Sequence, residues 1–73
     1  MNNQETVKYL RAEAKKLGLT FRLDKEVTLN GSPCYMFVCR KTGKLVLSLQ
    51  RLSVAHENMR SGYVATQAHR ILD

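Results

Sequence analysis

The chain has 73 residues, and its 12 lysine and arginine residues against 6 acidic residues give a net charge of +6. A chain this short is one small domain, so we expect a single domain over residues 1–73. No apolar run approaches the roughly 18 residues that a membrane span needs, and the polar N-terminus shows no hydrophobic leader. A positive field of this kind attracts nucleic acid, an anionic membrane or an acidic protein, and the alternative is a soluble protein that merely has a basic surface. Of these partners we expect an acidic protein or nucleic acid, and no membrane.

The first predicted element is a helix over residues 4–17. Either Asn2 or Asn3 can cap its start, and Gly18 ends it. Apolar residues recur along it at helical spacing, which predicts one buried stripe. The stripe consists of Val7, Leu10, Ala14 and Leu17.

Residues 19–23 alternate between apolar and polar side chains, which predicts a strand that continues to residue 29. Lys25 breaks the alternation, so we expect a bulge or bend there, in a strand at the edge of the sheet. Asn30-Gly31 is the clearest turn signal in the chain. An odd-length loop at this turn would place the apolar residues of both flanking strands on one face.

Residues 34–50 predict a β-hairpin that organises the fold. A three-residue loop, Lys41-Thr42-Gly43, closed by a glycine bulge, gives the hairpin one wholly apolar face, whereas a two-residue loop mixes the faces. The pairs on the apolar face are Cys39 with Leu45, Phe37 with Leu47, and Tyr35 with Leu49.

The opposite face of this hairpin carries Met36, Val38, Val46 and Ser48. It is only half polar, and an exposed apolar patch usually marks an interface. The sequence therefore also allows a homodimer through Met36, Val38 and Val46.

Beyond residue 50 the pattern becomes helical again. Ser53 is a plausible N-cap, and Gly62 divides the segment into two short helices in preference to one bent helix. The apolar positions at helical spacing are Leu52, Ala55, Met59, Val64, Ala68, Ile71 and Leu72. The fold class is then α+β: an N-terminal helix, a three-stranded antiparallel sheet and one or two short C-terminal helices in a two-layer sandwich.

Cys34 and Cys39 lie five positions apart on one predicted strand, which is about 16 Å and on opposite faces. A disulfide requires Cα atoms within about 7 Å, so these thiols stay free, which favours a reducing cytoplasm.

No catalytic constellation appears in the sequence. The two histidines, His56 and His69, have no acidic residue beside them, and the glycines are scattered singly between elements. A metal site built from both histidines and both cysteines fits poorly, because zinc ligands usually come in closely spaced pairs. We therefore expect no enzyme, no cofactor and no metal.

Basic residues cluster at three places: the predicted first helix, the first strand with Arg22 and Lys25, and the hairpin tip with Arg40, Lys41 and Lys44. Lys8, Arg11 and Lys15 lie along one side of the predicted first helix, where like charges repel and a counter-charge on a partner would relieve them. The alternative for such a stripe is an ordinary solvated face. The candidate binding surface is Lys8, Arg11, Lys15, Arg40, Lys41, Lys44 and Arg51.

The order helix, three strands, helix in a basic chain of 73 residues resembles the double-stranded RNA-binding domain. That resemblance implies RNA contacts through the first helix, the loop between the first two strands and a lysine-rich start of the last helix. In this chain the last segment begins Leu52-Ser53-Val54-Ala55-His56, without a lysine cluster, so no family residue is carried over.

The chain is also similar in style to small orphan proteins of tailed phages and prophages. The likeness rests on a helix ending at Lys15-Lys16-Leu17-Gly18, the turn Asn30-Gly31, the hairpin around Arg40-Lys41-Thr42-Gly43, and Gly62-Tyr63. It implies an accessory factor that binds and modulates a host protein.

Two functions from different classes therefore remain. The favoured one is a small, basic, non-enzymatic binding protein of the phage accessory type with an acidic host protein as partner. The alternative is a nucleic-acid-binding module that uses the basic hairpin tip and first helix on the phosphate backbone.

Overall fold

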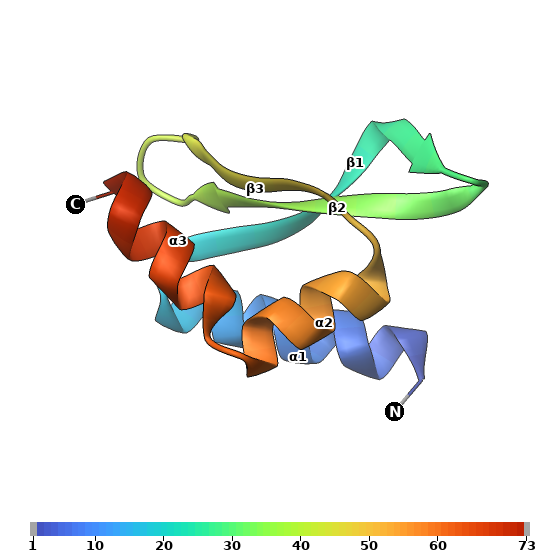
Figure 1. Ribbon diagram of the computed structural model, residues 1–73, viewed down its shortest axis with the longest axis horizontal. Helices are drawn as coiled ribbons and strands as arrows, with labels where there is room; N and C mark the ends of the chain where they lie inside the picture. Colours follow the sequence, from blue (N-terminus) through green and yellow to red (C-terminus); the bar gives the residue numbers. More distant parts are fainter. Residues whose placement is uncertain (1, 73) are drawn as a thin grey trace.

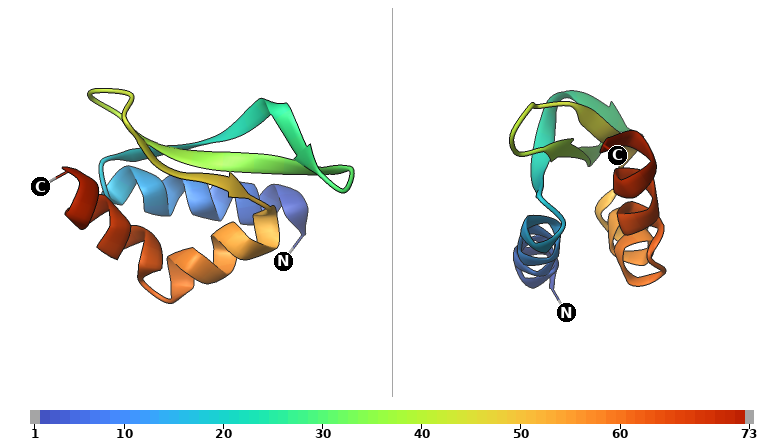
Figure 2. Two further views of the ribbon diagram at one scale, coloured as in Figure 1. Left: turned by 45° about the horizontal axis from the view of Figure 1, so that its top comes forward. Right: turned by 90° about the vertical axis from the view of Figure 1, so that its left-hand side faces the viewer.

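A computed structural model describes residues 2–72 (Figure 1). The strands form one antiparallel sheet in the order β1-β2-β3, and all the helices lie on one face of it (Figure 2). The predicted α+β sandwich, with two short helices after the sheet, is thereby confirmed. The elements are α1 (Asn3–Lys16), β1 (Leu19–Leu29), β2 (Ser32–Cys39), β3 (Leu45–Gln50), α2 (Leu52–Arg60) and α3 (Tyr63–Leu72).

Helix α1 forms as its sequence predicts. The Asn2 side chain caps it by accepting a hydrogen bond from the Glu5 N–H at 2.8 Å. Leu10 and Ala14 of the apolar stripe are fully buried. The helix ends at Lys16, and Gly18, whose φ is +74°, reverses the chain into β1.

Strands β1 and β2 pair one-to-one from Leu19 opposite Cys39 to Asp24 opposite Cys34. The register then shifts before Thr28, so the predicted irregularity at Lys25 is confirmed. The expected odd-length loop at Asn30-Gly31 is wrong. Both residues have positive φ, 51° and 80°, and form a two-residue hairpin turn, because the shift within β1 already realigns the strands.

The β2–β3 hairpin keeps only part of its predicted register. Phe37 lies opposite Leu47, as predicted, but two register shifts place Leu45 opposite Val38 and Gln50 opposite Tyr35. The predicted Cys39–Leu45 and Tyr35–Leu49 pairs are therefore wrong. The connection is also longer than predicted, since the Cys39 N–H donates to Lys44 O at 2.8 Å and leaves residues 40–43 as the loop.

These shifts decide which β3 side chains reach the core. Val46 is 6% exposed and packs with Phe37, whereas Leu45 is 49% exposed. The expectation that Val46 shares the outer face with Met36 is wrong, because the bulge turns Val46 inward. Leu49, at a φ of 57°, is also largely exposed.

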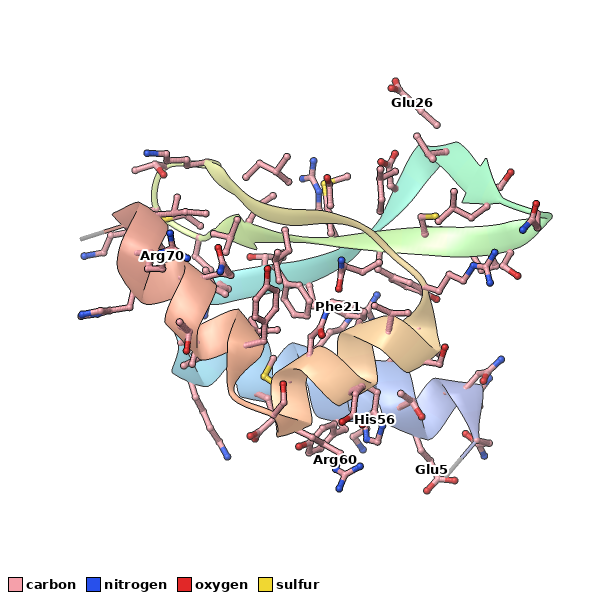
Figure 3. All side chains as sticks on the ribbon, in the orientation of Figure 1. Glu5, Phe21, Glu26, His56, Arg60 and Arg70 are labelled. Carbon is pink, nitrogen blue, oxygen red and sulfur yellow. The ribbon has the colours of Figure 1, made fainter. Side chains whose placement is uncertain are left out.

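The core lies between the sheet and the helix layer. Phe21 is at its centre, with ring centroids 4.8 Å from Tyr35 and 4.9 Å from Phe37 (Figure 3). Other core residues come from the helices and strands around it: Leu10, Ala14, Leu19, Val46, Ala55, Val64 and Ala68.

The start of α2 differs from its prediction. Arg51, not Ser53, is the N-cap residue, and it makes no side-chain capping bond. Leu52 packs against the core, so the helix begins upstream of the serine. Gly62, with φ of 86°, separates α2 from α3 as expected.

Candidate functional site

The basic residues of α1 and of the β2–β3 loop converge beside β1. The Arg40 N–H donates to Gly18 O at 3.0 Å, which holds the end of β2 against the junction between α1 and β1. A shallow hollow of about 230 Å³ results, with Arg11, Lys15 and Arg40 around it and Leu19, Thr20 and Phe21 lining it.

A second, larger hollow of about 770 Å³ continues along β1. Arg11 borders both hollows, and we call the pair the α1–β1 groove. The second hollow combines cationic, acidic and apolar side chains. They are Arg22, Leu23, Asp24, Lys25, Glu26 and Met36.

None of the groove cations forms an ion pair with an acidic residue among residues 2–72. Among residues 2–72 the ion pairs are Lys16 with Glu13 at 2.7 Å and Arg60 with Glu57 at 3.4 Å, both outside the groove. The Asp24 carboxylate accepts a hydrogen bond from the Glu26 N–H instead. The groove therefore presents a positive surface that an anionic partner can neutralise.

The groove includes three of the predicted surface residues, Arg11, Lys15 and Arg40, and the others lie elsewhere. Lys8 borders a separate hollow of about 490 Å³ with Arg11 and Tyr35. Lys41 is exposed in the loop between β2 and β3.

Two further residues of the predicted surface, Lys44 and Arg51, contact other parts of the fold and not the groove. The Lys44 Nζ donates to Ile71 O at 3.4 Å, where a cation suits the C-terminal end of α3. Arg51 occupies the N-cap position of α2 and lines a different hollow with Ser32 and Tyr35. Arg22 and Lys25 were recognised as basic residues of the first strand but left out of the candidate surface, and their position beside Arg11 depends on how helix and strand pack.

The residues predicted for a homodimer do not form one exposed patch. Met36 is partly buried and borders the groove, while Val38 and Val46 are 8% and 6% exposed. The large apolar side chains exposed on β3 are Leu45 and Leu49.

Both cysteines are free. Cys34 is fully buried, whereas Cys39 is partly exposed beside the loop. Hydrogen bonds from the Thr42 hydroxyl and from the backbone N–H groups of Thr42 and Lys41 lower the pKa of the Cys39 thiol.

Within residues 2–72 no three His, Cys, Asp or Glu side chains lie together in a way that could hold a metal ion. His56 makes an edge contact with the ring of Tyr9, with centroids 5.5 Å apart. Over the same residues, every helix is too short or too polar to cross a bilayer.

No protein-family model, curated protein or solved structure matches this chain. The geometry of the α1–β1 groove is therefore the basis for a functional proposal.

Proposed function

We propose that this protein is a non-enzymatic binding protein that attaches to an acidic surface of another protein through the α1–β1 groove. The observation that supports it is the convergence on one hollow of Arg11 and Lys15 from α1 and Arg40 from the β2–β3 loop, none of which forms an ion pair with a residue among 2–72. Like charges so gathered repel one another, and a carboxylate-bearing partner relieves that repulsion.

The mixed chemistry of the groove favours a protein partner over nucleic acid. Leu23, which is 42% exposed, and Met36 lie in the same hollow as Arg11 and Arg22. Apolar and cationic groups side by side suit a protein segment that combines apolar and acidic residues. Phe21 lines the first hollow but is only 2% exposed, and among residues 2–72 no tyrosine borders either hollow, so no exposed ring is available there for stacking on bases.

Nucleic-acid binding is the second candidate, and one observation favours it. Two guanidinium groups, those of Arg11 and Arg40, border one hollow, and guanidinium forks bind phosphate oxygens well. Such binding weakens linearly with the logarithm of salt concentration, with a slope of about −0.9 per phosphate contact on duplex DNA.

In the cell, we propose a cytoplasmic accessory factor of the phage or prophage type. The unpaired cysteines support a reducing compartment, and the similarity in style to phage orphan proteins supports the accessory role.

The test compares two double variants with the same net charge. Arg11→Glu with Arg40→Glu reverses the groove, and Arg60→Glu with Arg70→Glu reverses two arginines on α2 and α3 (Figure 3). Each double variant lowers the net charge by four, from +6 to +2. Full-length wild type and both variants are immobilised and exposed to a lysate of the source cell.

We expect wild type and the α2–α3 variant to retain one stoichiometric acidic protein that the groove variant loses. A gel shift with duplex and single-stranded oligonucleotides at low salt runs in parallel. Oligonucleotide binding that only the groove variant loses would replace the protein proposal with the nucleic-acid one. Equal retention by both variants would remove the groove as the binding surface.

A further inference from the structure

The inner face of β1 loses its cover partway along the strand. Leu19, Phe21 and Leu23 are alternate residues of a regularly paired segment, so their side chains face the same side of the sheet, toward the helices. Leu19 and Phe21 are 1% and 2% exposed, whereas Leu23 is 42% exposed. The helix layer therefore covers the first part of this face and leaves the position of Leu23 open.

Tyr35 of β2 borders the same opening. It lies opposite Leu23, and residues directly opposite each other share a face of the sheet. Its ring stacks on that of Phe21, with centroids 4.8 Å apart, but Tyr35 is only partly buried. Beyond Asp24 the register of β1 shifts, and the strand rises away from the helix layer (Figure 1). The core thus has an open end at Leu23 and Tyr35.

Helix α1 provides the other wall of this opening. Val7, one turn before Leu10 in the apolar stripe, is partly buried and lines the hollow of about 490 Å³ together with Tyr35. Leu23 lines the adjoining hollow, and Arg11 borders both hollows. We call Val7, Leu23 and Tyr35 the anchor site. The hollow beside it has room for a leucine or phenylalanine side chain.

The charges around the anchor site indicate what occupies it. Lys8 and Arg11 border the 490 Å³ hollow, both are exposed, and neither forms an ion pair with a residue among 2–72. A two-fold dimer through this surface would bring the cations of both copies together, which is unfavourable. An apolar side chain carried by an acidic segment fills the hollow and neutralises the cations.

We propose that the acidic segment of the partner carries one apolar anchor residue, a leucine or phenylalanine, which packs into the anchor site. The carboxylates of the same segment pair with Arg11, Lys15 and Arg40. The inference rests on the proposed function and adds to it the apolar residue that the partner must present.

The length of α1 sets the spacing between anchor and acidic residues. Val7 and Lys15 are eight residues apart on the helix, which is about 12 Å at a rise of 1.5 Å per residue. An extended segment covers that distance in about four residues, at roughly 3.3 Å each. The anchor of an extended partner therefore stands about four positions from its acidic residues.

The test measures the binding of two labelled peptides to the full chain by fluorescence anisotropy at low salt. In one peptide a leucine is followed by three serines and then by four glutamates, and in the other a serine replaces the leucine. Each peptide is made in both chain directions. We expect the leucine peptide to bind at least about tenfold more tightly in one direction, as burial of one leucine side chain implies.

Two variants of exposed strand leucines provide the matched comparison. Leu23→Gln keeps the side-chain length but replaces its apolar end with an amide. Leu45→Gln is the control, because Leu45 is 49% exposed and lines neither hollow beside the anchor site. We expect Leu23→Gln alone to weaken binding of the leucine peptide, by about three- to tenfold, and to leave binding of the serine peptide unchanged. Circular dichroism and urea denaturation check that both variants fold.

The outcomes separate the anchor from the proposed function. Equal binding of the two peptides that Arg11→Glu with Arg40→Glu abolishes would overturn the anchor and leave the groove proposal standing. Absence of binding by either peptide would overturn both. Equal weakening by Leu23→Gln and Leu45→Gln would also overturn the anchor site. Self-association that rises with protein concentration and is lost in Leu23→Gln would replace the acidic partner with a second copy of the chain.

Discussion

The two edge strands of the sheet differ in regularity and in charge. Strand β1 pairs one-to-one with β2 from Leu19 to Asp24, whereas β3 has two register shifts and a leucine, Leu49, at positive φ. Bulges and flanking charges are both ways by which proteins prevent unwanted edge pairing. Here β3 relies on backbone geometry, whereas the regular segment of β1 is covered beside the α1–β1 groove, since Leu19 and Phe21 are 1% and 2% exposed.

The largest expected effect comes from truncating Phe37, the residue of β2 that lies opposite both edge strands. Phe37 is fully buried on β2, opposite Phe21 on one side and Leu47 on the other. We expect Phe37→Ala to lower the free energy of unfolding by about 3–5 kcal/mol in urea denaturation. Val54→Ala, at a 44% exposed helix position, is the control and should change little. A similar loss of unfolding free energy in both variants would show that Phe37 is not a core residue.

The next test concerns the bulge that distinguishes β3. We expect Val46→Ala to cost about 2 kcal/mol, because Val46 is buried, and Leu45→Ala to cost less than about 1 kcal/mol, because Leu45 is half exposed. Thermal and urea denaturation of the two variants measure the difference. A larger loss of unfolding free energy in Leu45→Ala than in Val46→Ala would show that Leu45, and not Val46, faces the core, as the regular register predicts.

A smaller effect is expected at the strained position of β3. Leu49→Gly should raise the free energy of unfolding by up to about 1 kcal/mol, since a left-handed conformation costs an ordinary residue about 1–2 kcal/mol and glycine little. Leu45→Gly, at similar exposure, should instead destabilise the strand. Equal losses at the two leucines would argue against backbone strain at the β3 edge.

The two cysteines report on the β1 edge, because they lie opposite the ends of its regular segment, Leu19 and Asp24. The lowered pKa of Cys39 gives it more thiolate at a given pH, so iodoacetamide should modify Cys39 at lower pH than a thiol of ordinary pKa. Thr42→Val removes the hydroxyl hydrogen bond and should move the profile to higher pH.

Cys34, which is fully buried, should react only when the β1–β2 ladder opens. Mass spectrometry of the alkylated chain measures both rates. If Cys34 reacts as fast as Cys39 in the native protein, the regular segment of β1 is less stable than its pairing indicates.

The sequence predicted the helices well because helical spacing and caps are local signals. Asn2, Gly18 and Gly62 all act at the helix ends as expected. The hairpin register was only partly predictable, since Leu45 and Val46 are adjacent and both apolar. Which of them turns inward depends on a bulge, and alternation of residue types does not reveal one.

The candidate site was predictable to a similar degree. The spacing of Arg11 and Lys15 on one helix side could be deduced from the chain alone, and so could the basic loop. Arg40 lies beside them because its backbone N–H donates a hydrogen bond to Gly18 O, and the sequence does not reveal this long-range contact. Lys44 reaches the end of α3 for the same reason: long-range packing, not local pattern, sets its partner.

The bond between Arg40 and Gly18 has one further consequence. It fixes the loop that carries Arg40 to the turn that follows α1, the helix of Arg11 and Lys15, so these two cationic segments are linked. The surface is preorganised, and a partner that docks there would lose little conformational entropy on the protein's side. Affinity should then be governed by how readily the partner's own segment becomes ordered.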